Sequence, residues 1–123
     1  MDVSREARAA IGEAVTRLER DFYGRGPGLV KVSVGDTDPE VITVVSFDTL
    51  TAADRTLRER GDENAVTAHH RALHEATAKD FCAAIETIVG RAPSSYLAQL
   101  DPSTALAVRV FVFVSDETSE ILT

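Results

Sequence analysis

Residues 105–114 have the sequence ALAVRVFVFV, which is typical of a β-strand because β-branched and aromatic residues are enriched in strands. Successive side chains of a strand point to opposite faces of its sheet. The side chains on the two faces are Leu106, Val108, Val110, Val112 and Val114 on one, and Ala105, Ala107, Arg109, Phe111 and Phe113 on the other. Both faces of this predicted strand are therefore apolar, apart from Arg109.

A turn precedes this strand. Residues 101–104 are Asp-Pro-Ser-Thr, and these residue types favour turns because proline fixes its φ angle and the polar side chains bond to nearby backbone. Residues 94–100 supply a second extended segment before the turn. We therefore predict a hairpin at the C-terminal end of the chain.

Another hairpin is predicted earlier in the sequence. Residues 29–34 place three valines on one face and Lys31 and Ser33 on the other, as a half-buried strand does. Residues 35–39 contain glycine, aspartate and proline, which favour a turn, and residues 41–47 are β-branched and apolar on both faces. We expect an antiparallel hairpin whose second strand lies nearer the centre of the sheet.

Three helices are predicted from apolar residues spaced by three and four positions and from capping residues. The first spans residues 4–23 and ends at Gly24. Thr51 and Asp54 form a capping-box pattern for a short helix that extends to about residue 60. Asp62 is placed to cap a longer helix that ends at Gly90. The apolar stripe of the long helix consists of Val66, Leu73, Thr77, Phe81, Ala84, Ile85 and Ile88.

The predicted order of elements is α-ββ-αα-ββ. Two hairpins joined by helices predict an α+β fold with a four-stranded antiparallel sheet and helices packed on one face. We expect one domain over residues 1–114, followed by a polar, frayed tail over residues 115–123.

The predicted sheet has more apolar surface than one layer of helices is expected to cover. Phe111, Phe113, Leu29 and the second face of residues 41–47 are too apolar to be left in water. Either the helices or a partner chain must cover them. We expect a homodimer that uses the surface around the two phenylalanines.

Composition excludes several classes of protein. The formal net charge is −7, and no run of Lys and Arg offsets it, so a nucleic-acid partner is not expected. The longest unbroken apolar run is far shorter than the roughly 20 residues that cross a bilayer, so we expect no membrane insertion. The N-terminal residues do not resemble a signal peptide, and Cys82 is the only cysteine. We expect a cytoplasmic protein.

The glycine-rich loop at residues 24–28 is the first candidate for a binding site. Gly24, Gly26 and Gly28 allow backbone amides to point into one concavity, and Arg25 could add a bidentate contact to an anion. Phosphate loops, however, precede a helix N-terminus, whereas this loop follows a helix C-terminus. The interpretation that we favour is structural, with Arg25 contacting carbonyl groups or a carboxylate at the corner between helix and strand.

The histidines are the second candidate. His70 and His74 share a helical face at a spacing that zinc ligands use. A metal site needs more ligands, and Cys82 is about 12 Å farther along the helix than His74. We therefore expect no metal and no cofactor, with His69, His70 and His74 solvated or at the edge of an interface. Cys82 is expected to pack as a small apolar residue. No catalytic motif is present, so no catalytic residue is assigned.

The run FYGRGP, residues 22–27, follows an amphipathic helix and resembles the YbcI-like family, also called MpsC. The valine-rich strand at 42–47, the segment at 50–61, the long helix ending in Gly90-Arg91, and the apolar strand ending at 110–114 are similar to that family in order and spacing. The match covers about residues 11–114. The His69-His70 pair and Cys82 depart from the family pattern.

The resemblance implies a small cytoplasmic protein related to proteins that are linked to a sodium-translocating or inorganic-carbon-related membrane system. We interpret the chain as a non-enzymatic binding or assembly module, accessory to a membrane transport system and in contact with a transport partner protein. Two alternatives are a small-molecule or anion sensor that uses the loop at residues 24–28 and a metal-dependent enzyme that uses the histidines.

Overall fold

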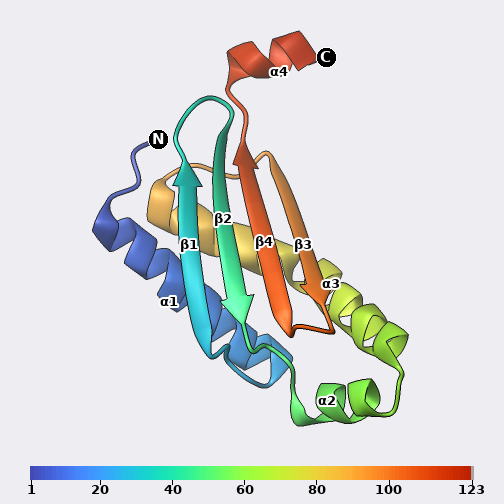
Figure 1. The fold of residues 1–123 in the computed structure, drawn as a ribbon. Coiled ribbons are helices and arrows are strands. Elements are labelled where there is room, and N and C mark those ends of the chain that lie inside the picture. The colour runs from blue at the N-terminus through green and yellow to red at the C-terminus, as the bar shows by residue number, and fades with distance from the viewer. Residues whose placement is uncertain (123) are drawn as a thin grey trace.

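The computed structural model describes residues 1–122, which form one antiparallel sheet, two long helices and two short helices (Figure 1). The elements in chain order are α1 (Arg5–Tyr23), β1 (Leu29–Gly35), β2 (Glu40–Phe47), α2 (Ala52–Glu59), α3 (Glu63–Val89), β3 (Ser95–Asp101), β4 (Leu106–Phe113) and α4 (Asp116–Leu122). The predicted α+β class and element order are confirmed, and the predicted strand ends shift by no more than one residue.

The strands lie in the order β1-β2-β4-β3, with every neighbouring pair antiparallel. β2 lies between β1 and β4, as its two apolar faces predicted. Thr43 of β2 pairs with Ser33 on one side and with Val110 on the other, so the register is continuous across the sheet. α1 and α3 lie side by side against one face of the sheet, which confirms the predicted single helical layer (Figure 1).

Capping residues set the helix ends. The Ser4 hydroxyl accepts a hydrogen bond from the Ala7 amide at the start of α1. Thr51 and Asp54 form the predicted capping box of α2, in which each side chain accepts from the other residue's amide. Gly24 ends α1 at φ 83°, a left-handed conformation that glycine adopts without steric cost.

The covered face of the sheet holds the main core. Ile42 and Val44 of β2 and the two phenylalanines of β4 are fully buried there. They pack against apolar side chains of α1 and α3, which supply Ile11, Val15, Phe81 and Ile85. The α1–α3 layer therefore covers Phe111 and Phe113 completely, and the prediction that a second copy covers them is wrong.

The surplus of apolar surface lies on the opposite side of the sheet, which we call the open face. Its side chains are those that alternate with the covered ones: Leu29, Lys31 and Ser33 of β1, Val41, Thr43, Val45 and Phe47 of β2, Leu106, Val108, Val110 and Val112 of β4, and Ser95, Leu97, Gln99 and Asp101 of β3. No helix lies over this face in the described part of the chain (Figure 1).

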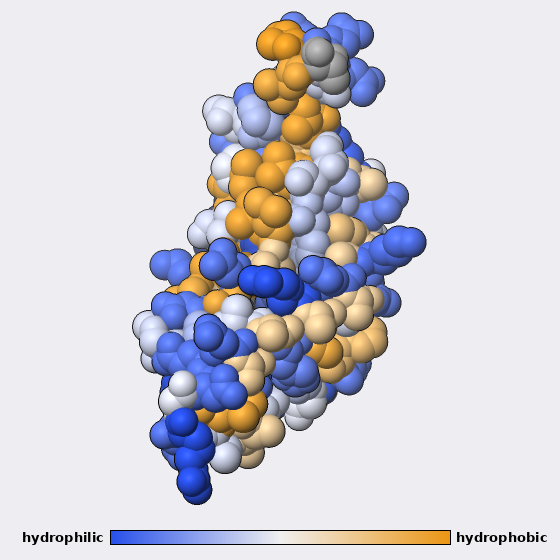
Figure 2. Space-filling model, turned by 90° about the vertical axis from the view of Figure 1, so that its right-hand side faces the viewer, coloured by the Kyte–Doolittle hydropathy of each residue, from blue (hydrophilic) through white to orange (hydrophobic). Residues whose placement is uncertain are grey.

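The segment after β4 differs from the expected frayed tail. Within its described part it forms α4, which projects beyond the end of the sheet (Figure 1). The Ser115 hydroxyl accepts from the Thr118 amide, as an N-cap does, and donates to Asp38 at 2.8 Å. Hydrophobic side chains are visible on this projecting helix at the top of Figure 2, and Ile121 is 78% exposed.

Candidate functional site

Arg25 of the glycine-rich loop contacts the segment that follows β2. Its Nη1 atom donates to the carbonyl groups of Asp48 and Leu50 at 2.6 and 3.0 Å, and its Nη2 atom donates to Asp48 Oδ2 at 2.8 Å. These are the carbonyl and carboxylate contacts that the structural interpretation of the loop expects. Anion binding at this loop stays a prediction.

Asp48 explains two further features of this corner. The hydrogen bond from Arg25 lowers the pKa of the Asp48 carboxyl, and Arg55 donates a further bond to it at 3.0 Å. A Cβ atom at position 28 would lie 3.2 Å from the Asp48 Cβ, so this close approach favours glycine there. Gly26 has no such contact. The loop is thus held to the β2–α2 connection by charged hydrogen bonds.

His70 and His74 lie in different environments, and neither is solvated. Both are buried on the apolar stripe of α3, where they continue the i, i+4 row that begins at Val66, so the expectation of a solvated or edge position is wrong for them. His70 Nε2 lies 2.8 Å from Asp54 Oδ2 on α2. His74 Nδ1 is hydrogen-bonded to the Tyr23 hydroxyl. The two imidazoles therefore do not face a common ligand position.

A buried polar cluster, which we define as Glu19, Tyr23, His74, Tyr96 and Arg109, lies between α1, α3 and the sheet. Arg109 is fully buried and forms an ion pair with Glu19. Its Nε atom donates to the Tyr96 hydroxyl at 3.1 Å, and its guanidinium lies 4.1 Å from the centre of the Phe81 ring. Among described residues, Glu19 Oε2, Arg109 Nη2 and His74 Nε2 have no hydrogen-bond partner.

Burial shifts the pKa values of His74 and Tyr96 away from neutral pH. Burial, aided by the charges of Arg109 and His70, lowers the pKa of His74 to about 4. Burial raises the pKa of the Tyr96 hydroxyl to about 12. His74 and Tyr96 are therefore both uncharged at neutral pH, and the cavity between Glu19, His74 and Arg109 has no room for a water-sized sphere. The arrangement connects helices to the sheet and offers no space to a substrate.

A second polar group lies at the α2–α3 junction. Asp54, His69 and His70 each present one potential metal-ligating atom, and these atoms all lie within 4.8 Å of one another. Burial acts to raise the pKa of Asp54, but the hydrogen bonds from His70 and Thr51 outweigh it and hold the pKa below its usual value. The Asp54 carboxyl is therefore ionised at neutral pH, although it is buried.

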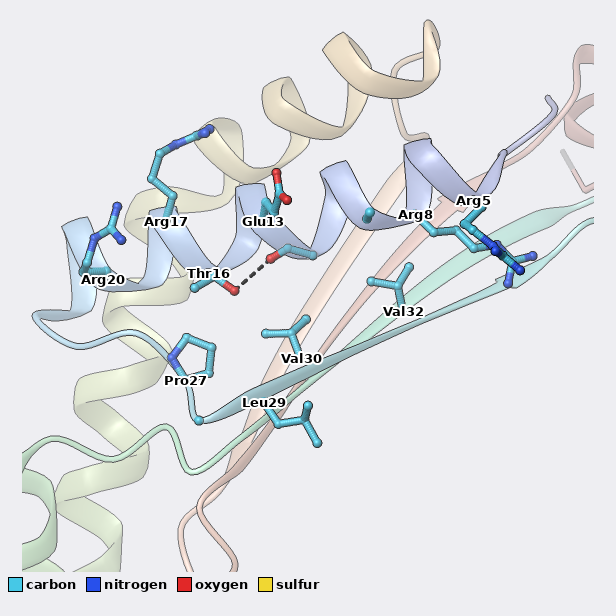
Figure 3. A pocket seen from close by; sticks show the side chains of 13 residues that line it. Arg5, Arg8, Glu13, Thr16, Arg17, Arg20, Pro27, Leu29, Val30 and Val32 are labelled. Atoms are coloured by element: carbon cyan, nitrogen blue, oxygen red, sulfur yellow. Dashed lines mark hydrogen bonds between the residues drawn. The ribbon is translucent and has the colours of Figure 1, made fainter.

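A groove of about 890 Å³ runs between α1 and the edge strand β1, and we call it the arginine groove (Figure 3). Its wall residues include Gly12, Thr16, Val30 and Val32 between the helix and the strand, with Arg5 and Arg8 at one end and Arg17 and Arg20 at the other. Arg5, Arg8 and Arg17 form no ion pair with any described residue, whereas Arg20 lies 3.6 Å from Asp21. The groove therefore has arginines at both ends, and Glu13 is the one acidic residue among the described residues of its wall.

Cys82 is half-buried beside the main core, and burial raises the pKa of its thiol. A thiol with a raised pKa is a weak nucleophile at neutral pH. Its packing is consistent with the expected role as a small apolar residue.

Sequence reasoning missed the buried polar cluster, although two patterns could have indicated it. Arg109 shares a strand face with Phe111 and Phe113, which predicts a buried guanidinium. Glu19 belongs to the i, i+4 row that also contains Val15 and Tyr23, which predicts that its carboxylate lies inside. Asp54 was recognised as a capping residue, but its contact with His70 depends on how α2 packs on α3.

Comparison with protein families gave one match that spans nearly the whole chain. Residues 4–115 match the family described as the Na⁺-translocating membrane potential-generating system (MpsC). Comparisons with curated proteins and with solved structures gave no match. No helix in the described range 1–122 combines the length and the apolar composition that crossing a membrane requires.

Proposed function

The chain belongs to the MpsC family, and we propose that it is a non-enzymatic binding and assembly module that forms a homodimer through the open face. We further propose that it acts in the cytoplasm as an accessory to a membrane system that transports an ion or inorganic carbon. The family description supports the link to a membrane system. The observation that carries the assembly role is the apolar composition of the open face.

The open face has the composition of an interface rather than of a solvated sheet surface. Along its two central strands, Thr43 is the only polar side chain, and the remainder are valine, leucine and phenylalanine. Leu97 and Leu29 on the edge strands are 65% and 63% exposed. An antiparallel sheet with one face in water normally alternates apolar and polar residues. Apolar patches of this kind mark interaction sites.

Apart from Thr43, the polar residues of the open face lie on its edge strands, as the rim of an interface does. β1 contributes Lys31, and β3 contributes Asp101. A two-fold axis parallel to the strands would place β1 of one copy over β3 of the other, so these opposite charges would lie on facing edges. This complementarity supports a second copy as the occupant, because homodimers most often have two-fold symmetry.

The test is the mass of the protein in solution, measured by light scattering at micromolar concentration. We expect a dimer for the wild-type chain and a monomer for Val110→Lys, which places a charge at the centre of the open face. Ala83→Lys on the exposed side of α3 is the matched control and should stay dimeric. A monomeric wild-type protein, or a dimer that survives Val110→Lys, would contradict the assembly role.

A second candidate function, recognition of an anionic small molecule, is favoured by the unpaired arginines of the arginine groove. Arg5 and Arg8 at one end have no acidic partner among described residues, and such guanidinium groups bind carboxylates and phosphates. Thermal melts in a series of inorganic phosphate concentrations test it. We expect a melting temperature that rises with phosphate in the wild type and in Glu13→Gln, and that does not rise in Arg5→Gln/Arg8→Gln.

A further inference from the structure

The α2–α3 junction brings together three side chains with metal-ligand chemistry. His69 and His70 are neighbours on α3, and Asp54 lies on the first turn of α2. Asp54 Oδ1 lies 3.5 Å from His69 Nδ1, and Asp54 Oδ2 lies 2.8 Å from His70 Nε2. All three ligand atoms fall within 4.8 Å of one another, so one ion could contact all of them after small side-chain movements.

Two of these ligands are held in place by the fold. The side chains of Asp54 and His70 are 1% and 3% exposed. Asp54 Oδ2 also accepts from the Thr51 amide at 3.0 Å, which fixes the carboxylate through the capping box. Outer hydrogen bonds of this kind orient the ligands of metal sites. The protein therefore presents a carboxylate and an imidazole before any ion arrives.

The third ligand gives the site access to solvent. The His69 side chain is 56% exposed and lies on the outer side of the Asp54 carboxyl. A neutral imidazole can carry its hydrogen on either ring nitrogen, so both histidines can present an unprotonated nitrogen to an ion. An ion bound here would have solvent at its remaining coordination position.

We propose that Asp54, His69 and His70 form a binding site for one divalent transition-metal ion of the Zn²⁺ type, which joins α2 to α3. Two imidazole nitrogens and one carboxylate oxygen form a ligand set that suits Zn²⁺, Co²⁺ and Ni²⁺ better than Mg²⁺ or Ca²⁺. His74 takes no part, because its ring nitrogens are not among the ligand atoms that lie within 4.8 Å of one another, and its Nδ1 is bonded to Tyr23. The site differs from the helical His70–His74 pair that the spacing suggested, and it is independent of the open face.

The test is a Zn²⁺ titration of the metal-free full chain in competition with a chromophoric chelator, together with the visible absorption of the Co²⁺-loaded protein. We expect one ion per chain and a Co²⁺ spectrum typical of nitrogen and oxygen ligands. His69→Ala removes an exposed ligand and should leave the fold intact while it weakens Zn²⁺ binding by at least about 10-fold. Glu75→Gln, an exposed change farther along α3, is the matched control and should bind as the wild type does.

Asp54→Asn provides a second variant that keeps the shape of the side chain and removes its charge. We expect it to weaken Zn²⁺ binding by at least about 10-fold as well, with folding checked by circular dichroism. Absence of Zn²⁺ binding by the wild type would overturn the proposal. Equal affinity of the wild type and His69→Ala, or binding that depends on His74 and not on His69, would also overturn it.

Discussion

The two faces of the sheet differ in where their polar groups lie: the covered face combines the main apolar core with buried polar groups, whereas the centre of the open face is almost entirely apolar. Between the covered face and the two helices lie the Glu19–Arg109 ion pair, which joins α1 to β4, and the Tyr23–His74 hydrogen bond, which joins α1 to α3. The open face carries an almost continuous apolar surface across β2 and β4. The hydrogen bonds and ion pairs of the covered face fix how the helices lie on the sheet, whereas nothing in the described chain covers the apolar open face.

Adjacent residues of β4 show the contrast most directly. Arg109 is fully buried against α1 and α3, and Val110, the next residue, points to the open face. A shift of one residue in the register of β4 would exchange the two faces and place a valine against Glu19. The Glu19–Arg109 pair therefore selects the register, while the valines that alternate with it supply the surface for assembly.

The largest expected effect comes from removing one partner of the buried ion pair. Arg109→Met leaves the Glu19 carboxylate buried without a counter-charge, and we expect the free energy of unfolding to fall by about 3 to 5 kcal/mol. Chemical denaturation of both proteins at neutral pH measures the change. The double variant Glu19→Leu/Arg109→Met should recover most of the loss, because paired apolar side chains can replace a buried ion pair. A loss below about 1 kcal/mol in the single variant would show that the pair does not hold the covered face together.

The next effect is a pH dependence that arises from His74. Its pKa falls from 6.5 to about 4 on folding, so the unfolded chain binds more protons between these pH values. Stability from this residue is therefore present above about pH 6.5 and is lost as the pH falls toward 4, by roughly 3 kcal/mol. Denaturation at several pH values measures the slope. His74→Asn cannot titrate and should show a shallower slope, and equal slopes would mean that His74 is accessible to protons in the folded state.

The sequence predicted the fold better than it predicted the covered face. Alternation in β4 and capping residues such as Thr51 and Asp62 act locally, so they identify strands and helix starts without knowledge of the tertiary structure. Which face of β4 the helices would cover depends on packing between distant segments. Phe111 and Phe113 were therefore assigned to a dimer surface, although the face with the larger aromatic side chains is the one that the helices cover.

The candidate sites also differ in whether local sequence or tertiary packing determines them. The loop at residues 24–28 was interpreted from its glycines, from Arg25 and from its place after a helix C-terminus. The contacts of Arg25 match the favoured interpretation because a corner between helix and strand offers free carbonyl groups. The link between Asp54 and His70 joins residues on two different helices, so no spacing within one helix could predict it. The valines of the open face were visible in the sequence, but their exposure depends on the number of helices that the chain can place over the sheet.

A substitution of Arg25 tests how much hydrogen bonds contribute to stability where burial is incomplete, because its side chain is 34% exposed and yet donates to two carbonyl groups. We expect Arg25→Ala to lower the free energy of unfolding by about 1 to 3 kcal/mol through loss of charge-assisted hydrogen bonds. Arg55→Ala, which removes only an exposed contact to Asp48, should change stability by less than about 0.5 kcal/mol. Inorganic phosphate should shift the melting temperatures of the wild type and of Arg25→Ala equally. A phosphate-dependent rise that is lost only in Arg25→Ala would instead assign an anion site to the loop.

The smallest effect on stability is expected from a substitution on the open face. The informative measurement there is how the melting temperature depends on protein concentration. Leu97→Thr replaces an exposed leucine of the edge strand β3 with a residue that favours strands, so a dilute sample should differ from the wild type by no more than about 0.5 kcal/mol. If a second copy covers the face, the wild-type melting temperature rises with protein concentration, because association stabilises the folded chain by mass action. The rise should be smaller in Leu97→Thr, which removes apolar area from the interface, and unchanged in Ala83→Ser on the exposed side of α3. A wild-type melting temperature that does not depend on concentration would mean that water, and not a second copy, covers the valines of β2 and β4.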